Sequence, residues 1–222
     1  MPSIQAIVFD VDGLMIDTER LGYRIFQEIL AERGIHLGDE HYVEIIGLDQ
    51  FDTAVYLVAQ TGVALSPAAL NELYYARFEL ALLNRLEPNP GLPELLAELR
   101  RRRIPLGIAS NSPVGYLARV LRVIHAERFF QVVVGRDLVA AGKPAPDVYL
   151  GAAERLGVSP AVCLAIEDSA VGMQSALAAG MRCAVVNEQP DGPAFARATA
   201  RYTSLPALQA ALDELLCCKD EG

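Results

Sequence analysis

The chain has 222 residues and a mass of 24.0 kDa, which is enough for one compact domain with an insert or for two small domains. Hydrophobic residues make up 52% and charged residues 21%, which excludes a disordered or fibrous chain. The formal net charge of −9 would repel a polyanion, so we expect no nucleic-acid partner.

The hydropathy pattern and the cysteines favour a cytoplasmic protein. The first ten residues, MPSIQAIVFD, lack the basic stretch and cleavage site of a secretory signal, and no apolar run approaches the roughly 20 residues that span a bilayer. Cys163 and Cys183 lie in apolar runs, and Cys217 and Cys218 are adjacent without the further ligands that zinc needs. We expect no membrane contact and reduced thiols, with oxidation of the Cys217 and Cys218 pair as the alternative.

Short runs rich in valine and isoleucine alternate with longer helical patterns along most of the chain. This alternation is typical of an α/β protein with a parallel sheet flanked by helices. The expected strands are residues 4–9, 105–109, 130–134, 162–166 and 183–186, and the expected helices between them are residues 92–102, 114–123, 147–156 and 171–179. In such a fold, ligands bind beyond the carboxyl ends of the strands.

The interval between the first two strands has a helical pattern throughout. Its expected helices are residues 19–34, 39–47, 49–62 and 66–86, and Ser66 followed by Pro67 is typical of a helix start. We therefore expect an all-helical domain, residues 17–87, inserted into a core domain formed by residues 1–16 and 88–222. The Pro- and Gly-rich residues 87–91 would be the return hinge.

Two aspartates follow the first strand. The apolar run IQAIVF leads into Asp10, Val11, Asp12 and Gly13, and alternation in an extended chain places Asp10 and Asp12 on the same side. Because like charges repel, a cation or a proton held by one carboxyl must offset the cost. The alternative is that these residues only cap a turn.

A second acidic pair, Glu167 and Asp168, follows another apolar strand. Parallel strands direct their carboxyl ends to one edge of the sheet, so the two acidic clusters can meet there. Oxygen ligands favour a hard cation, and a site shared with phosphate and water suits Mg²⁺ better than Ca²⁺. Capping of the following helix is the alternative role for Glu167 and Asp168.

Two polar segments complete the set. Ser110, Asn111 and Ser112 follow the second strand and offer a hydroxyl and backbone N–H groups beside a helix start, where anions bind. Lys143 lies in the proline-containing loop AGKPAPD before another helix. Taken alone, Ser110 would be a helix cap and Lys143 a surface cation, but as members of a spaced set both indicate a phosphate site.

These motifs together resemble the haloacid dehalogenase superfamily, and most of all its phosphoglycolate phosphatase and β-phosphoglucomutase-like branch. Asp10 with Asp12, then Ser110, Lys143 and Glu167 with Asp168 occur in the family's order, and the helical insert matches that branch. The resemblance implies a Rossmann-like core, an inserted helical cap, dependence on Mg²⁺ and an aspartyl-phosphate intermediate.

The resemblance also implies a role for each residue. Asp10 would attack a phosphomonoester, and Asp12 would act as general acid and then general base. Mg²⁺ would be held by Asp10, the backbone carbonyl of Asp12, and Asp168 with Glu167 in support. The residues expected to bind the phosphate are Ser110, Asn111, Lys143 and, at the start of the cap, Thr18. Lys143 and Mg²⁺ leave the four carboxylates one negative charge in excess, which a proton on Asp12 would cancel.

Three positions depart from the sugar-phosphate mutase of that branch. The mutase has a histidine at the position of Gly22, an arginine at that of Gln50 and a lysine at that of Pro113. Without these groups a second phosphate loses its positive partners, so a phosphatase is favoured and a mutase is the alternative. A dehalogenase would not need Asp12 or the pair Glu167 and Asp168.

The expected partner is a small-molecule phosphate ester, such as a phosphosugar or a phosphoglycolate-like compound, and we expect a monomer or a weak dimer. The histidines show no ligand spacing. The aromatic residues of the insert fall at helical intervals and are expected to form its core.

Overall fold

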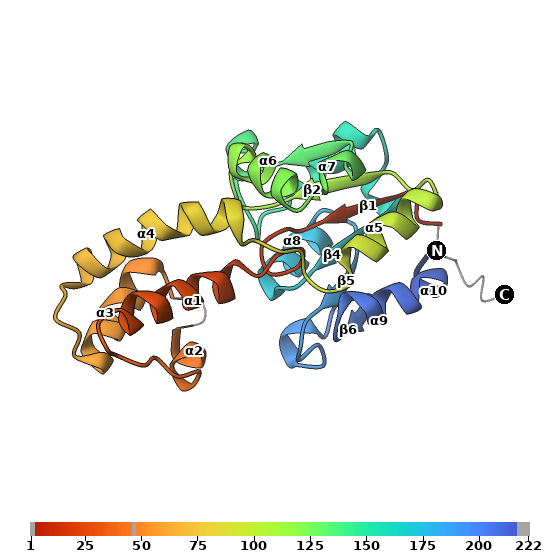
Figure 1. The fold of residues 1–222 in the computed structure, drawn as a ribbon. Helices are drawn as coiled ribbons and strands as arrows, with labels where there is room; N and C mark the ends of the chain where they lie inside the picture. The colour runs from red at the N-terminus through yellow and green to blue at the C-terminus, as the bar shows by residue number, and fades with distance from the viewer. Residues whose placement is uncertain (1–2, 46–47, 217–222) are drawn as a thin grey trace. The chain divides into compact units, whose positions relative to one another are not determined.

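The computed structural model describes residues 3–45 and 48–216, and the chain divides into two compact units (Figure 1). The first unit comprises Met1–Ile16 and Glu87–Gly222, and the second comprises Asp17–Leu86. Cys217 and Cys218 lie outside the described residues, whereas Cys163 and Cys183 are buried free thiols.

The first unit is built on a six-stranded sheet in the order β3-β2-β1-β4-β5-β6, in which every neighbouring pair is parallel. The strands are β1 (Ala6–Phe9), β2 (Leu106–Ala109), β3 (Val132–Val134), β4 (Cys163–Glu167), β5 (Arg182–Val186) and β6 (Ala200–Tyr202). This confirms the expected α/β class and the five expected strands. The sixth strand was not expected, because three residues that are only half-buried or exposed give no apolar run.

Helices flank this sheet (Figure 1). They are α5 (Leu92–Arg101), α6 (Val114–Val123), α7 (Asp147–Leu156), α8 (Ala170–Ala178), α9 (Leu205–Ala210) and α10 (Leu212–Leu216), with 3₁₀ turns at Glu127–Phe129, Arg136–Leu138, Pro160–Val162 and Pro193–Phe195. Helix α7 packs on β1, β2 and β3, and the fully buried Tyr149 lies in the core that they share. The four helices expected in this unit are present, whereas α9 and α10 were not expected.

Strand β1 lies at the centre of the sheet and positions the site. All four of its residues are buried, and Phe9 is in register with Ile108 of β2 on one side and Ile166 of β4 on the other. The residues that follow these three strands therefore emerge at one edge of the sheet. Asp10 follows β1, Ser110 follows β2, and Glu167 is the last residue of β4, so all three lie at this edge.

The loop after β1 is tied to the segment that returns from the second unit. The backbone N–H of Asn89 donates to Met15 O at 2.8 Å, and its side-chain amide donates to Gly13 O and Leu14 O, both at 2.9 Å. The segment suggested as a hinge is thus bonded to the loop that carries the first acidic motif.

The described residues of the second unit form four helices: α1 (Thr18–Ala31), α2 (Glu40–Ile45), α3 (Gln50–Thr61) and α4 (Pro67–Asn84). Side chains of Asp17, Asp49 and Ser66 accept the N–H groups of the first turns of α1, α3 and α4. Phe26 and Tyr74 stack with ring centroids 4.5 Å apart, and Phe78 stacks on Tyr74 in turn. Phe51 and Tyr75 are about half exposed, so only some of the aromatic residues of the insert form its core.

Among the helices of the described residues, none combines the length and the apolar character needed to cross a membrane.

Candidate active site

Acidic and basic side chains from three segments meet at the carboxyl edge of the sheet. Asp10 follows β1, Glu167 ends β4, Asp168 follows it, and Lys143 comes from the loop before α7. Asp10 is 6% exposed and Glu167 is completely buried, and the Lys143 side chain is 5% exposed. The structure therefore brings together three of the predicted carboxylates and the predicted lysine.

Lys143 is the centre of this cluster. Its ammonium group donates to Asp10 Oδ1 and, at 2.6 Å, to Glu167 Oε1, and it lies 5.1 Å from the centre of the Tyr149 ring. Burial by itself would lower the pKa of Lys143, but the charges of Asp10 and Glu167 outweigh burial and raise it. Lys143 is therefore a permanently charged member of the site and not a surface cation.

Glu167 is held by the protein on both carboxylate oxygens. Tyr149 Oη donates to Oε1 at 2.6 Å, and Ser169 Oγ and the backbone N–H of Asp168 donate to Oε2 at 3.1 and 3.2 Å. Helix α8 is capped by Ser169, whose hydroxyl accepts the N–H of Gly172 at 3.1 Å. The capping role considered for Glu167 and Asp168 is therefore wrong.

The surroundings of Asp10 disfavour its charged form. Burial raises the pKa of Asp10 well above its ordinary value, and the nearby charges of Glu167 and Asp168 raise it further, against the opposite effect of Lys143. One ammonium group therefore does not offset the negative charge of the cluster, and a further positive charge would stabilise ionised Asp10.

The donor set fits a hard divalent cation. Asp10, Glu167 and Asp168 each offer one carboxylate oxygen, and these oxygens all lie within 4.8 Å of one another. Oxygen-only ligands of this kind suit Mg²⁺, Ca²⁺ or Mn²⁺ better than softer metals. Gly13 comes close to the same group, since a Cβ there would lie 2.1 Å from Asp168 Oδ2.

Asp12 is oriented by two hydroxyl groups. Ser112 Oγ donates to one of its carboxylate oxygens at 2.7 Å, and Tyr116 Oη donates to the other at 2.8 Å. Neither donor was predicted for Asp12, although Ser112 belongs to the polar segment noted after the second strand. Tyr116 lies in the first turn of α6, 104 positions along the chain from Asp12.

Ser110 and Asn111 lie beside the lysine loop. Ser110 is 2% exposed, and its hydroxyl accepts the N–H of Ser112 at 3.0 Å. Helix α6 begins only at Val114, whose N–H is accepted by Asp137, so Ser110 is not its cap. The Asn111 amide accepts the N–H of Lys143 at 2.7 Å and donates to its carbonyl at 3.3 Å, which fixes the lysine loop.

Thr18 is the one predicted site residue that belongs to the other compact unit, where it is the first residue of α1. Its role toward the phosphate stays a prediction.

A parallel sheet with carboxylates and a buried lysine at its carboxyl edge defines a class of α/β proteins, and comparison with known families identifies the family within that class. Residues 7–186 match the model of the haloacid dehalogenase-like hydrolase family. Hexitol phosphatase B of Escherichia coli K12 is 33% identical over 213 residues, 93% of this chain and 95% of that protein. A phosphorylated carbohydrates phosphatase of Thermotoga maritima is 29% identical over 199 residues, 89% of this chain and 92% of that protein.

A solved structure agrees with these matches. The crystal structure of a hydrolase of the same family from Deinococcus radiodurans is 33% identical and superposes with a TM-score of 0.80, covering 96% of each chain. The chain therefore belongs to the haloacid dehalogenase-like hydrolase family. This confirms the expected family, and the named relatives confirm the expected enzyme class, a phosphatase.

A substitution at Gly172 in α8 would test how tightly the Glu167 carboxylate is held. A Cβ at this position would lie 1.8 Å from Glu167 Oε1, and five donors from Lys143, Tyr149, Asp168 and Ser169 prevent that carboxylate from moving away. We expect Gly172→Ala to lower the free energy of unfolding by about 1–3 kcal/mol, the usual cost of overpacking a core. Urea unfolding would measure this loss.

Gly115 in α6 is the matched control, because a Cβ there meets nothing within 4 Å. Gly115→Ala should leave the stability unchanged or raise it slightly, since alanine favours a helix over glycine. Equal stabilities of the two variants would contradict the packing described around Glu167.

Proposed function

We propose that this protein hydrolyses the phosphomonoester of a small metabolite, a phosphosugar or a phosphoglycolate-like compound, through an aspartyl-phosphate on Asp10. The observation that carries the proposal is Asp10 itself. It is a buried carboxylate at the sheet edge, paired with Lys143 and within 4.8 Å of the oxygens of Glu167 and Asp168. Asp12, two residues further on, supplies a second carboxyl for proton transfer.

In the first step, a carboxylate oxygen of Asp10 forms a bond to phosphorus as the bond from phosphorus to the ester oxygen breaks. Lys143 contacts Oδ1, and we assign the attack to Oδ2. The leaving alkoxide needs a proton, which protonated Asp12 donates as general acid. The products of this step are a phosphorylated Asp10, ionised Asp12 and a free alcohol.

In the second step, ionised Asp12 takes a proton from water, and the resulting oxygen nucleophile attacks phosphorus. The bond between phosphorus and Asp10 breaks, so that inorganic phosphate leaves and Asp12 is protonated again. Ser112 and Tyr116 hold the Asp12 carboxylate at 2.7 and 2.8 Å, which supports its use in both directions because its position is fixed.

Asp10, Glu167 and Asp168, with the backbone carbonyl of Asp12, are the proposed ligands of Mg²⁺. When bound there, Mg²⁺ supplies positive charge that offsets repulsion between Asp10 and the phosphate dianion. Lys143, which contacts Asp10 and Glu167, supplies further positive charge. Ser110, the N–H of Asn111 and Thr18 are the proposed partners of the remaining phosphate oxygens. The helical unit is the proposed cap.

A sugar-phosphate mutase is the alternative that the sequence raises. The structure adds one observation against it: a Cβ at Gly22 would lie 2.7 Å from the Tyr74 hydroxyl, so no histidine fits there without displacing Tyr74. The names of the relatives, a hexitol phosphatase and a phosphorylated carbohydrates phosphatase, also support hydrolysis of a phosphorylated carbohydrate.

Substitution of the two aspartates tests the chemistry. We expect Asp10→Asn to lower kcat on p-nitrophenyl phosphate by more than about 10³-fold, since an amide is a poor nucleophile. Asp12→Asn should lower kcat by about 10²–10⁴-fold and leave a phosphorylated enzyme that decays slowly, detectable by mass spectrometry after a quench in acid. Asp191→Asn, at a carboxylate that is 92% exposed, is the control. Full activity of Asp10→Asn would refute the assignment.

Removal of metal tests the ligand set. We expect EDTA to abolish phosphate release and Mg²⁺ to restore it. At 100 times its dissociation constant, Mg²⁺ should also stabilise the folded protein by about 2.7 kcal/mol, which thermal unfolding would show as a higher Tm. Asp168→Asn should remove most of that Tm increase, whereas Asp191→Asn should keep it. A Tm that does not respond to Mg²⁺ in the unaltered protein would argue against a metal site.

A panel of phosphosugars separates hydrolysis from transfer. With glucose 1-phosphate and a bisphosphate activator, we expect free phosphate to accumulate and no isomer to form, as phosphate assay and chromatography would show. Formation of glucose 6-phosphate without release of phosphate would favour the mutase instead.

A further inference from the structure

Tyr116 contacts the side chain that the proposed mechanism uses as acid and base, Asp12. Its hydroxyl donates to Asp12 Oδ1 at 2.8 Å, while the Ser112 hydroxyl donates to Asp12 Oδ2 at 2.7 Å. All three residues are half-buried and belong to the sheet unit. Because a carboxylate oxygen has two lone pairs, one hydroxyl donor on each oxygen does not use up either of them. These two contacts therefore orient Asp12 and still leave it able to take up a proton.

The first turn of α6 holds the Tyr116 ring in place. The N–H of Val114, the first residue of this helix, is accepted by the Asp137 carboxylate at 2.9 Å. Leu117, directly after Tyr116, is completely buried, and α6 packs on β3. Side chains that project from helices are placed more precisely than side chains on loops. Tyr116 therefore holds Asp12 from a rigid support, whereas Ser112 holds it from the loop after β2.

A hydroxyl partner suits a carboxyl group that changes its protonation state twice in each turnover. The phenol O–H of Tyr116 donates to ionised Asp12, and the phenol oxygen accepts from protonated Asp12, so the contact can persist in both states. An ammonium or guanidinium group has donors only and would favour the ionised form alone. The contact between Tyr116 and Asp12 is thus of a kind that serves an acid in one step and a base in the next.

We infer that Tyr116 is a positioning residue for proton transfer by Asp12. Its hydroxyl fixes the carboxyl that protonates the leaving oxygen in the first step, and the carboxylate that takes a proton from water in the second. The inference rests on the proposed phosphatase function and adds a residue to it. Its consequence is that the loss of the Tyr116 hydroxyl affects each step only as far as that step needs Asp12.

Two esters of similar size separate the two steps. p-Nitrophenyl phosphate releases a stable anion that leaves without a proton, whereas benzyl phosphate releases an alkoxide that needs one from Asp12. The value of kcat/KM reports the first step, in which the alcohol leaves, and kcat also includes hydrolysis of the phosphorylated enzyme. The second step is the same for both esters.

Tyr116→Phe removes the hydroxyl and keeps the ring. We expect kcat/KM for benzyl phosphate to fall by about 10-fold, the cost of one hydrogen bond, because Ser112 still holds Asp12. For p-nitrophenyl phosphate, kcat/KM should stay within about 2-fold while kcat falls, since only its second step needs Asp12. Phosphorylated enzyme should then accumulate, which a burst of nitrophenolate and mass spectrometry after an acid quench would detect.

General damage to the active site would lower kcat/KM for the two esters equally. An equal loss in Tyr116→Phe would therefore overturn the inference, and so would an unchanged kcat/KM for benzyl phosphate.

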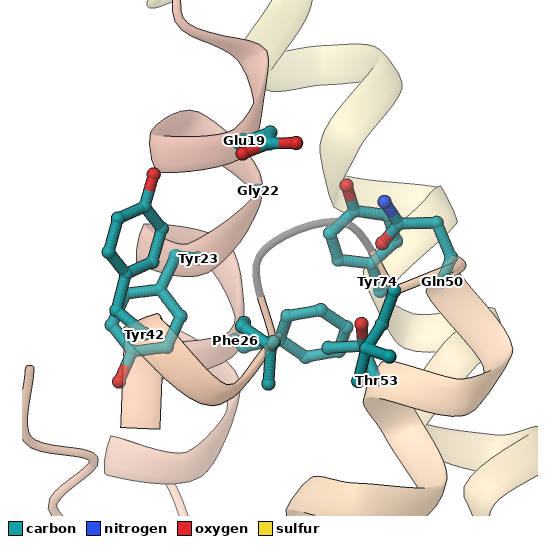
Figure 2. A pocket seen from close by; sticks show the side chains of 10 residues that line it. Glu19, Gly22, Tyr23, Phe26, Tyr42, Gln50, Thr53 and Tyr74 are labelled. Atoms are coloured by element: carbon teal, nitrogen blue, oxygen red, sulfur yellow. The ribbon is translucent and has the colours of Figure 1, made fainter. Parts of the chain in front are cut away.

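Tyr75 provides the matched control. Tyr23, Tyr42 and Tyr74 line a pocket of the helical unit (Figure 2), and Tyr75 is not among the described residues of its wall. Tyr75 is also 51% exposed, so Tyr75→Phe removes a hydroxyl of the same kind far along the chain from Asp12. It should leave kcat/KM for both esters unchanged. The same split between the esters in Tyr75→Phe would overturn the assignment to Tyr116.

A double-mutant cycle tests whether Tyr116 acts through Asp12. Asp12→Asn and the double variant Asp12→Asn with Tyr116→Phe should hydrolyse benzyl phosphate equally slowly, because the Tyr116 hydroxyl then has no proton-transfer group to position. A further loss of about 10-fold in the double variant, equal to the loss in Tyr116→Phe alone, would show independent action and overturn the inference.

The unaltered protein and Asp12→Asn separate failure of the inference from failure of the proposed function. If the unaltered protein releases no phosphate from either ester, or if Asp12→Asn keeps full activity, the proposed function fails and the inference fails with it. If the unaltered protein is active, Asp12→Asn is slow and Tyr116→Phe treats both esters alike, only the inference fails.

Discussion

The buried contact of Lys143 with Asp10 and Glu167 is the interaction on which the rest of the site depends. Carboxylates cannot collect at a buried sheet edge unless positive charge collects with them, and one lysine leaves Asp10 with a raised pKa. This imbalance is useful to an enzyme. It makes the site attractive to a divalent cation, whose charge would favour the ionised form of Asp10.

The sheet unit could be predicted well because its signals are local. Each buried strand of four or five residues is a visible apolar run, and the polar residues that end it must emerge at one edge when the strands are parallel. Asp10, Ser110, Glu167 and Asp168 follow from this argument alone. Strand β6 and helices α9 and α10 were not predicted, because short and partly exposed elements depend on tertiary packing for their stability.

The partners of these residues could not be predicted, since they depend on side-chain reach across the fold. Ser112 and Tyr116 lie 100 and 104 positions from Asp12, and nothing in their spacing indicates a shared carboxylate. Tyr149 was recognisable only as a buried residue of a helix, although it donates to Glu167. The aromatic residues of the helical unit show the same limit, because helical spacing indicates burial and does not distinguish a core from a pocket wall.

The two compact units differ in the charged side chains that they gather. The sheet edge gathers three carboxylates, those of Asp10, Glu167 and Asp168, beside the ammonium group of Lys143. The pocket of the helical unit has one carboxylate, Glu19, and no lysine, arginine or histidine among its described lining residues. Gly22 and Gln50 stand where the sugar-phosphate mutase of this branch has a histidine and an arginine, and both positions belong to the helical unit and not to the sheet unit that carries the carboxylates.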